Sequence, residues 1–576
     1  MILSGYWLAL ALFLPLFTAI ILMVWPNMRR AAMAIAPWSA LPALSIALIP
    51  MDFATIKLPG LLLGTQIGLD ETSRYFLLLA ALVWLTAGLY AKRSFATPEQ
   101  PGFFILFLLA MVGNLGAIIA SGILSFYFFF ALMSFAAYGL VIHKQTPEVL
   151  RAGRIYMVFV VLGEVMLLSA LMLAASESSG YDFESIRTAV AESEHRNAII
   201  LLTVMGLGIK IGLPGLHFTL PLIYRAAPIP AAVVLAGAMV NAGLLGWLRL
   251  LPAGEVVLAE WSTALMALGL FAAFYGVLVG LTQRDAKTLL AYSSISQMGI
   301  LTFAVGLGLG APQAWPQILM VITLYAVHHG LAKGALFLGV GVAQNCPDSR
   351  HWRWLVGLGL LLPALALAGA PLTSGMLAKG LLKEELGLAP WPEALGWLLT
   401  LSSLTTTLLV ARFVYLAWPR SGDKQQTSAP DHFPSWLLLL AASLLVVWFL
   451  PRPTEVELLS LSVWWKSLWP VLFGIAIAVI AAKFIKARRI RVIEIPVGDL
   501  LVPLESISQK FIKALAWLTA VQLPRWQQQL SNSIGAVGGG YRGADKTLAL
   551  IETKLANWPI AVILLLTLIV ALVLWS

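Results

Sequence analysis

The chain has 576 residues, of which 60% are hydrophobic and 11% are charged. A soluble domain carries about 25% charged residues, so this composition excludes a soluble enzyme, a disordered protein and a disulfide-built secreted domain. Cys346 is the single cysteine, which excludes an intrachain disulfide and a thiolate metal cluster, and the net charge of +10 comes mainly from short loops between apolar runs.

Apolar runs long enough to cross a membrane recur along nearly the whole chain. A membrane helix needs about 20 apolar residues, and on this measure the sequence predicts about 16 transmembrane helices. The predicted spans are 6–25, 32–50, 74–91, 103–120, 122–142, 155–175, 198–222, 230–250, 261–281, 289–309, 317–343, 354–383, 393–417, 434–450, 463–482 and 557–575. The runs are continuous, whereas a membrane β-barrel would alternate apolar and polar residues.

The basic residues in the loops predict the orientation of these spans. If the N-terminus faces outward, Lys and Arg in the cytoplasmic loops clearly outnumber those in the outer loops, as the positive-inside rule requires. Arg29 and Arg30 follow the first apolar run instead of preceding it, so this run is expected to be a membrane helix and not a cleaved signal peptide.

Segment 487–556 departs from the pattern of spans. Apolar residues recur there at helical spacing between charged and polar ones, which predicts an amphipathic helix lying along the membrane face or against partner helices. The predicted organisation is N-terminal helices at 1–100, a first repeat at 101–252, a second repeat at 253–418, further helices at 419–486, the lateral helix and a linker at 487–556, and a last anchor at 557–576.

A few ionisable residues fall inside the predicted spans. A charge at the bilayer centre costs about 2.5–3.5 kcal/mol even on the gentlest scale, so each one suggests a functional role. These residues are Glu164, Lys210, His217, His328, His329, Lys333, Lys379 and Lys383. His329 and Lys333 are four residues apart, which places them on one face of a helix. His328 points elsewhere, and Lys383 is best explained as part of a solvated helix end.

Two of the charged spans contain helix breakers. Pro214 follows Lys210 closely, and Pro371 precedes Lys379. Backbone groups freed by proline and glycine are tolerated at membrane depth only where protein or water satisfies them. The two broken spans are five apart, and because five is odd they have opposite orientations. This pattern predicts two inverted five-helix repeats with ion sites between them, in an all-α polytopic membrane protein.

The buried residues suit the transfer of protons. Moving Glu164 toward or away from Lys210 would change how firmly the lysine holds its proton. Histidines titrate near neutrality and can link lysines through water. The sequence has no phosphate-binding loop, zinc-ligand spacing or nucleophile elbow, and we expect neither a cofactor nor a metal.

Five stretches of the chain resemble a known family. They are ALMSFAAYGLVI (131–142), GIKIGLPGLHFTLP (208–221), DAKTLLAYSSISQMG (285–299), HHGLAKGALFLGVG (328–341) and GAPLTSGMLAKGLL (369–382). In order and spacing they resemble the antiporter-like proton-translocating subunits of respiratory complex I, Mrp-type cation/proton antiporters and membrane-bound group 4 hydrogenases. The resemblance covers roughly residues 60–420.

The resemblance implies roles for individual residues. Lys210 falls on the central lysine of the first half-channel, His329 and Lys333 on the central pair of span eleven, and Lys379 on the residue near the outer exit. Glu164 falls on or near the acid of span six. With His217, which is as plausible a channel residue as a satisfied interior histidine, these residues form the predicted proton path.

Two positions differ from the family pattern. Ala131 stands where the family usually has a glutamate, and Asn241 stands where it often has a lysine. Three interpretations follow: Glu164 replaces the missing glutamate, protons enter elsewhere, or the subunit is a scaffold that does not pump. Related subunits of bicarbonate-accumulating complexes carry a similar VNAG sequence around the position of Asn241, which keeps inorganic-carbon uptake open as an alternative.

The expected function is therefore proton translocation, with sodium/proton exchange as a variant, in a subunit of a larger redox-driven complex. The subunit holds no redox group of its own, so its energy would come from partner membrane subunits. The expected location is the bacterial inner membrane, and the expected partners are other membrane subunits, lipid and protons, with no nucleic acid.

Overall fold

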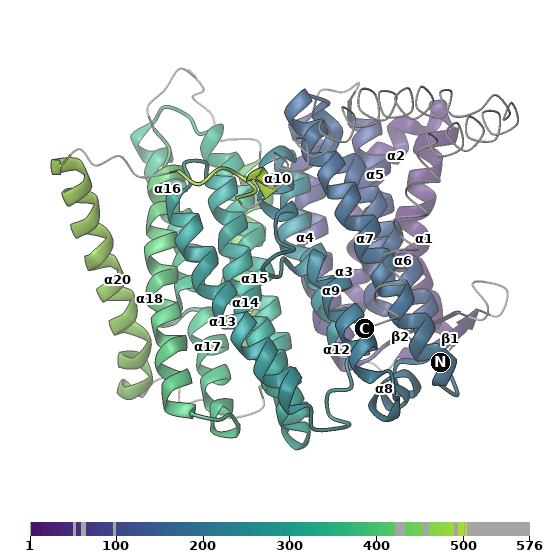
Figure 1. The fold of residues 1–576 in the computed structure, drawn as a ribbon. Helices are drawn as coiled ribbons and strands as arrows, with labels where there is room; N and C mark the ends of the chain where they lie inside the picture. The colour runs from purple at the N-terminus through teal and green to yellow at the C-terminus, as the bar shows by residue number, and fades with distance from the viewer. Residues whose placement is uncertain are drawn as a thin grey trace, which may run out of the picture. The chain divides into compact units, whose positions relative to one another are not determined.

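The structure is a computed structural model that describes residues 2–49, 53–58, 65–95, 99–420, 432–452, 460–488, 494–499 and 501–503. Residues 1–500 form one compact unit and residues 501–576 form another. The fold described below is that of the first unit. Its long helices lie side by side with similar axis directions (Figure 1).

The described residues are mostly α-helical. The α-helices are α1 (Ile2–Val24), α2 (Arg29–Ile35), α3 (Leu41–Leu48), α4 (Glu71–Ser94), α5 (Gln100–Ile119), α6 (Ile123–Val141), α7 (Pro147–Glu177), α8 (Phe183–Glu192), α9 (Arg196–Ile211), α10 (Thr219–Ala226), α11 (Ile229–Val234), α12 (Val240–Leu250), α13 (Ala259–Thr282), α14 (Ala286–Gly310), α15 (Trp315–Gln344), α16 (Arg350–Ala368), α17 (Ser374–Glu384), α18 (Pro392–Ala417), α19 (Phe433–Leu445) and α20 (Leu461–Arg488).

Short helices of other types connect or interrupt them. A π-helix, η4 (Leu235–Met239), lies between α11 and α12. The 3₁₀-helices are η1 (Pro26–Met28), η2 (Ala36–Trp38), η3 (Ile142–Lys144), η5 (Pro312–Ala314), η6 (Glu385–Leu388) and η7 (Val446–Phe449).

Within the described part of the chain, 13 helical segments are long and apolar enough to cross a membrane. The protein is therefore an integral membrane protein, as its composition predicted. The sequence predicted about 16 spans, and three of these predicted spans account for the difference from the 13 found. Span 198–222 is divided into α9 and α10, span 434–450 is a shorter apolar helix, and span 557–575 lies outside the described residues. The predicted lateral helix beyond residue 503 also lies outside them.

The predicted all-α membrane fold is confirmed, and one small element within it is not helical. Strands β1 (Phe53–Leu58) and β2 (Thr65–Leu69) form an antiparallel hairpin between α3 and α4. The hairpin extends to the loop before α6, because the Ser121 N–H donates to the Gln66 carbonyl oxygen at 3.0 Å. The strands are too short to produce a hydropathy signal, and apolar runs dominate the sequence around them.

Helices α14 and α15 form the centre of the bundle. Their apolar segments are wholly buried, whereas α20 is largely exposed. Polar residues therefore face protein on every side of α14 and α15. Any charge on these two helices must be satisfied by other helices or by water, since it cannot face lipid.

Helices α13 and α14 pack backbone against backbone. A Cβ atom added at Gly299 would lie 2.6 Å from the Gly269 carbonyl oxygen and 2.7 Å from the Ala273 nitrogen. These neighbours are main-chain atoms, which cannot move aside as a flexible side chain can. Small residues at helix crossings give this close approach in membrane proteins.

We expect the substitution Gly299→Ala to destabilise the protein by about 1–3 kcal/mol, because the added methyl group must separate α13 from α14. The measurement is thermal unfolding of the detergent-solubilised chain. Gly102→Ala is the matched control, since a Cβ at that helical position has no neighbour within 4 Å. Equal melting temperatures for the two variants would contradict the proposed close packing.

The two broken spans share one local structure. Gly212 ends α9 with a φ of 86°, and Gly369 ends α16 with a φ of 88°. In each case the N–H after the glycine donates to the carbonyl oxygen five residues earlier, from Leu213 to Gly208 and from Ala370 to Leu365. Glycine adopts this left-handed conformation without the penalty of a Cβ atom, which explains why both helices end there. The inverted repeat of whole five-helix units stays a prediction.

Candidate functional site

Lys210 lies in the last turn of α9, immediately before the first break. Its Nζ atom donates to the Ser134 hydroxyl at 3.2 Å and to the Tyr156 hydroxyl at 3.3 Å. The Tyr156 hydroxyl in turn donates to the Ser134 carbonyl oxygen at 3.0 Å. The lysine is thus held between α6 and α7 by two hydroxyl groups.

Glu164 of α7 lies close to this group and is 5% exposed. The Ser134 hydroxyl contacts its carboxylate as well as the Lys210 amine. Among the described residues no ion pair joins Glu164 directly to Lys210, so Ser134 stands between the acid and the base. Two ionisable groups that meet through one hydroxyl can change their separation without exposing either charge to lipid.

Asn241 lies at the start of α12, directly after the π-helix. Its Nδ2 atom donates to the Gly237 carbonyl oxygen at 2.8 Å, while its Oδ1 atom has no protein partner among the described residues. Helix α12 touches α9 beside Lys210, because a Cβ at Gly243 would lie 3.2 Å from the Lys210 Cβ.

The π-helix before α12 faces α15. The π-helix residue Gly237 lies against the backbone of Gly330, which is the neighbour of His329 in sequence. Asn241 therefore lies on the element that connects the surroundings of Lys210 with those of His329. π-Helical turns are frequent at functional sites because they shift the side chains that follow them.

The residues predicted on α15 are fully buried. His328, His329 and Lys333 are each 0% exposed. The Lys333 Nζ atom donates to the Leu290 carbonyl oxygen on α14 at 3.0 Å, and neither ring nitrogen of His329 has a protein partner in the described part of the chain. The predicted pairing of His329 and Lys333 on one helix face agrees with their positions in α15.

His328 contacts the second broken helix. Its Nδ1 atom lies 2.8 Å from the hydroxyl of Ser374, the first residue of α17. The sequence predicted that His328 points elsewhere than His329 and Lys333, and this hydrogen bond joins it to α17. It also fixes the start of α17 against the centre of the bundle.

Lys379 of α17 turns back to the end of α16. Its Nζ atom donates to the carbonyl oxygens of Leu367 at 2.8 Å and Ala368 at 3.2 Å. These carbonyls belong to the last turn of α16, where the helix dipole carries partial negative charge. The helix end therefore serves as the negative partner of the lysine.

Lys379 also lines an open cavity of about 600 Å³. The polar and charged lining residues are Lys379, Lys383, Glu384, Glu393, Thr400, Ser403, Lys466 and Ser467. Lys383 donates to the Thr400 hydroxyl at 2.7 Å. The cavity gives Lys379 access to an open space that Lys333, at 0% exposure, does not have.

His217 lies in the break between α9 and α10, and its partner is a residue that the sequence did not single out. Its Nε2 atom lies 3.0 Å from the Asp499 carboxylate, which also accepts a hydrogen bond from the Tyr292 hydroxyl at 2.8 Å. No hydrogen bond joins His217 to Lys210 in the described residues. His217 thus pairs with Asp499, whereas Lys210 pairs with Ser134 and Tyr156.

Sequence reasoning missed Ser134, Tyr156 and Asp499. Ser134 lies inside the quoted stretch ALMSFAAYGLVI, so its neighbourhood was marked although its role was not. Tyr156 carries no separate signal, because one tyrosine in an apolar helix is ordinary. Asp499 was not found because it is 282 residues from His217 and lies outside the predicted membrane spans.

Comparison with known families identifies the class of protein to which this bundle belongs. The family described as "NADH:quinone oxidoreductase/Mrp antiporter, TM" matches residues 120–410, which include every predicted site residue. The match covers half of the chain, and the chain belongs to this family of antiporter-like membrane subunits.

Individual relatives agree with this assignment. Hydrogenase-4 component B of Escherichia coli is 27% identical over 444 residues, covering 70% of this chain and 64% of that protein. A Na(+)/H(+) antiporter component of Bacillus subtilis is 25% identical over 401 residues, covering 67% of this chain and 79% of that protein. Several further relatives are matched over only 53–55% of their length.

Solved structures share the fold. A chain of the membrane-bound sulfane sulfur reductase, an archaeal respiratory membrane complex, has a TM-score of 0.66 at 20% identity, covering 97% of this chain and 99% of that one. A chain of the Mrp complex from a Dietzia species has a TM-score of 0.68 at 20% identity, covering 95% and 65%. At this identity the likeness concerns the fold alone.

Proposed function

We propose that this chain conducts protons across the membrane as an antiporter-like subunit of a larger, redox-driven complex. The observation that supports this most directly is a series of buried polar atoms without protein partners among the described residues. They are Glu164 Oε2, Asn241 Oδ1, Ser293 Oγ and both ring nitrogens of His329. Buried polar atoms are normally hydrogen-bonded, commonly by ordered water. A hydrated line of groups is what proton transfer requires.

The proposed route follows the order of these groups. Protons enter from the cytoplasm near Glu164 and Lys210, pass Asn241 on α12, reach His329 and Lys333 in α15, and leave by Lys379. The cavity beside Lys379 supports this end as the outlet, because it joins a partly buried lysine to an open space. The route has the N-terminus on the outer side, as the basic loops predict.

Asn241 takes a different role from the lysine that the family often has there. An amide does not release protons in the physiological range, so it cannot store one. It can bind water through Oδ1 and so link Lys210 to His329 without a stored charge. Transfer through this position would then depend on the two lysines and not on a third ionisable group.

The partners proposed for the chain are other membrane subunits. Its relatives carry the names of hydrogenase and antiporter components, and its structural neighbours belong to membrane complexes. The energy comes from those partners, in the inner membrane of a bacterium. The name of the B. subtilis relative makes sodium/proton exchange the variant to test, by measuring transport with and without Na⁺.

Glu164→Gln is expected to reduce proton transport by at least about 10-fold in sealed vesicles that contain the intact complex, because an amide cannot carry the proton. The structural reason is that Glu164 is the buried carboxylate that shares Ser134 with Lys210. Proton transport and the amount of assembled complex are measured together.

Glu148→Gln is the matched control for this experiment. Glu148 lies in the exposed first turn of the same helix and pairs with Arg225 at 3.6 Å on the surface. An exposed pair of this kind contributes about 0–1 kcal/mol, so transport should be unchanged. Undiminished transport in Glu164→Gln would show that Glu164 has not replaced the glutamate missing at Ala131.

Two other functions remain as alternatives. A non-pumping scaffold is favoured by Ala131 and Asn241, which remove two ionisable positions of the family. It is opposed by the buried Lys333 and the partly buried Lys210 and Lys379. A proton-coupled inorganic-carbon uptake complex is favoured by the VNAG sequence around Asn241. Purification of the complex separates these functions, because carbon uptake requires a zinc-bearing soluble partner.

A further inference from the structure

A short segment after α20 folds back onto the bundle. Residues 494–499, here called the strap, lie across the ends of α13 and α14, and Figure 1 shows them as the yellow-green segment beside α10. The loop between α13 and α14 carries Arg284, Lys287 lies in the first turn of α14, and Arg225 lies in the last turn of α10. In the sequence prediction all three fall in cytoplasmic loops.

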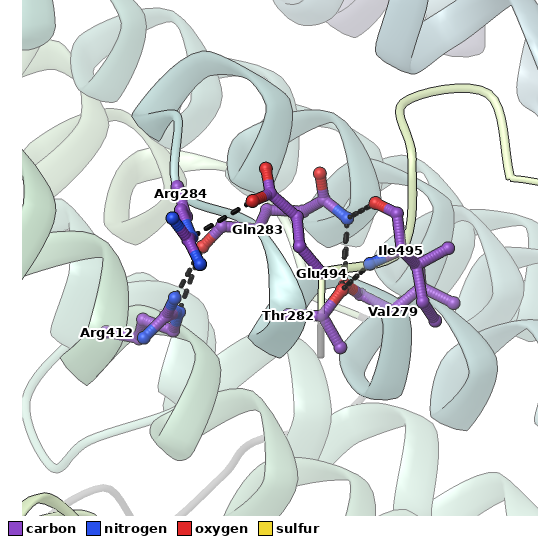
Figure 2. Close-up of polar contacts among 7 residues, drawn as sticks. All are labelled: Val279, Thr282, Gln283, Arg284, Arg412, Glu494 and Ile495. Carbon is purple, nitrogen blue, oxygen red and sulfur yellow. Dashed lines mark hydrogen bonds and ion pairs between the residues drawn. The ribbon is translucent and has the colours of Figure 1, made fainter. Parts of the chain in front are cut away.

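The first half of the strap is fixed by hydrogen bonds and one ion pair (Figure 2). The Gln283 side chain donates to the Ile495 carbonyl oxygen at 3.0 Å, and the Ile495 N–H donates to the Thr282 hydroxyl at 3.4 Å. The Arg284 guanidinium lies 2.9 Å from the Glu494 carboxylate, and both side chains are well exposed. Two hydrogen bonds to the main chain of Ile495 therefore hold the strap in place, and a surface ion pair lies beside them.

The second half of the strap turns into the bundle. The Asp499 N–H donates to the Pro496 carbonyl oxygen at 2.8 Å, which closes a tight turn. Gly498 has a φ of 91°, and Asp499 itself has a φ of 34°. A positive φ is uncommon for a residue with a side chain and is tolerated best by Asn and Asp. The turn directs the Asp499 side chain inward.

The Asp499 carboxylate reaches a buried polar group. It is 3.0 Å from His217 Nε2 and 2.8 Å from the Tyr292 hydroxyl, and it also contacts Tyr275 on α13. Asp499 is 7% exposed and His217 is 1% exposed. Helix α10, which has eight residues and is about 12 Å long at 1.5 Å per residue, lies between His217 and the loop predicted to be cytoplasmic.

Anchoring alone does not account for a carboxylate at this depth. The hydrogen bonds of Ile495 already hold the strap, and burying a charged group costs free energy that an apolar residue would not cost. The groups that face the carboxylate include one histidine and two tyrosine hydroxyls, from the α9–α10 break, α13 and α14. A histidine–carboxylate pair is a proton-binding unit.

We propose that Asp499 and His217 form a proton-binding site on the cytoplasmic side of the path, with the carboxylate supplied by the strap. This inference rests on the proposed proton transport and adds a group that none of the repeat helices carries. The ligand is a proton taken from water. Among the described residues, no group of three or more His, Cys, Asp or Glu side chains could hold a metal ion there.

The transfer conserves protons at each step. A proton from water binds the Asp499 carboxylate and passes to Nε2 of a neutral His217 whose proton is on Nδ1. The imidazolium then releases the Nδ1 proton toward the interior, where Nδ1 has no protein partner among the described residues. The pair regains its original net charge, and water-assisted transfer of the remaining ring proton from Nε2 to Nδ1 restores the first tautomer.

Asp499→Asn is the test, in sealed vesicles that contain the intact complex with the full-length chain. We expect proton transport at neutral pH to fall about 10- to 100-fold. The remaining transport should rise as the pH on the cytoplasmic side is lowered, because His217 must then take its proton directly from water. Asp499→Glu should recover at least half of the wild-type rate.

Glu494→Gln is the matched control, since it removes an acid from the exposed part of the same strap and should leave transport within twofold of wild type. If Asp499→Asn merely loosened the strap, its pH profile would keep the wild-type shape and Asp499→Glu would not restore transport; either result would overturn the proposal. If Lys333→Met stops transport while Asp499→Asn does not, this inference fails and the proposed function stands. If neither variant changes transport, both fail.

Discussion

Lys333→Met is expected to reduce proton transport by at least about 100-fold while leaving the protein folded. Lys333 is 0% exposed and makes one hydrogen bond, to the Leu290 carbonyl oxygen at 3.0 Å. No ion pair of Lys333 is present among the described residues, so no carboxylate holds its proton in place. Methionine has a similar length and fills the same space in α15, but it cannot bind a proton.

The stability of this variant separates loss of function from loss of fold. Removing a buried amine also removes the cost of burying its charge, so the melting temperature should be unchanged or higher. Lys144→Met, an exposed position in η3, is the control for the loss of a lysine. Transport at the wild-type rate in Lys333→Met would exclude Lys333 from the path.

Lys210→Arg is expected to reduce proton transport by about 100-fold even though the positive charge is retained. A guanidinium stays protonated under all physiological conditions, so arginine can hold the charge but cannot release the proton. Arginine can still donate to Ser134 and Tyr156, the two hydroxyls that Lys210 contacts. The variant therefore tests whether Lys210 carries a proton or only supplies a fixed charge.

The comparison with Lys210→Met completes this experiment. If Lys210 is a proton carrier, both variants lose transport to a similar extent. If it is a fixed charge that keeps Glu164 ionised, Lys210→Arg retains transport and only Lys210→Met loses it. Initial rates of proton uptake in vesicles, normalised to the amount of assembled complex, distinguish the two results.

Sequence reasoning was most successful where one physical rule dominates. The length of the apolar runs alone located the spans from α1 to α20, because an apolar run of this length is long enough to form a membrane-spanning helix. The cost of intramembrane charge marked Glu164, Lys210 and Lys333, and the structure places all three in protein-lined surroundings. Pro214 and Pro371 correctly indicated the two broken helices, although only the structure shows that each break begins at a glycine.

The sequence was less informative where function depends on contacts between distant segments. The partnership of His217 with Asp499 joins two residues that no periodicity relates. The role of Ser134 between Glu164 and Lys210 depends on how α6, α7 and α9 cross. The hydropathy pattern does not determine the angles at which helices cross. The β1–β2 hairpin was missed because its short strands lie between long apolar runs.

The counter-charge of Lys379 comes from a helix end, so it responds to substitution differently from the counter-charge of Lys210. The negative partners of Lys379 are the main-chain carbonyls of Leu367 and Ala368, whereas the acid near Lys210 is the side chain of Glu164. A single substitution removes a carboxylate, but every amino acid supplies the same carbonyl. Only a change that moves the end of α16, at Gly369 or Pro371, can remove the partner of Lys379. The surroundings of Lys379 can therefore drift in sequence over generations while the lysine keeps its counter-charge.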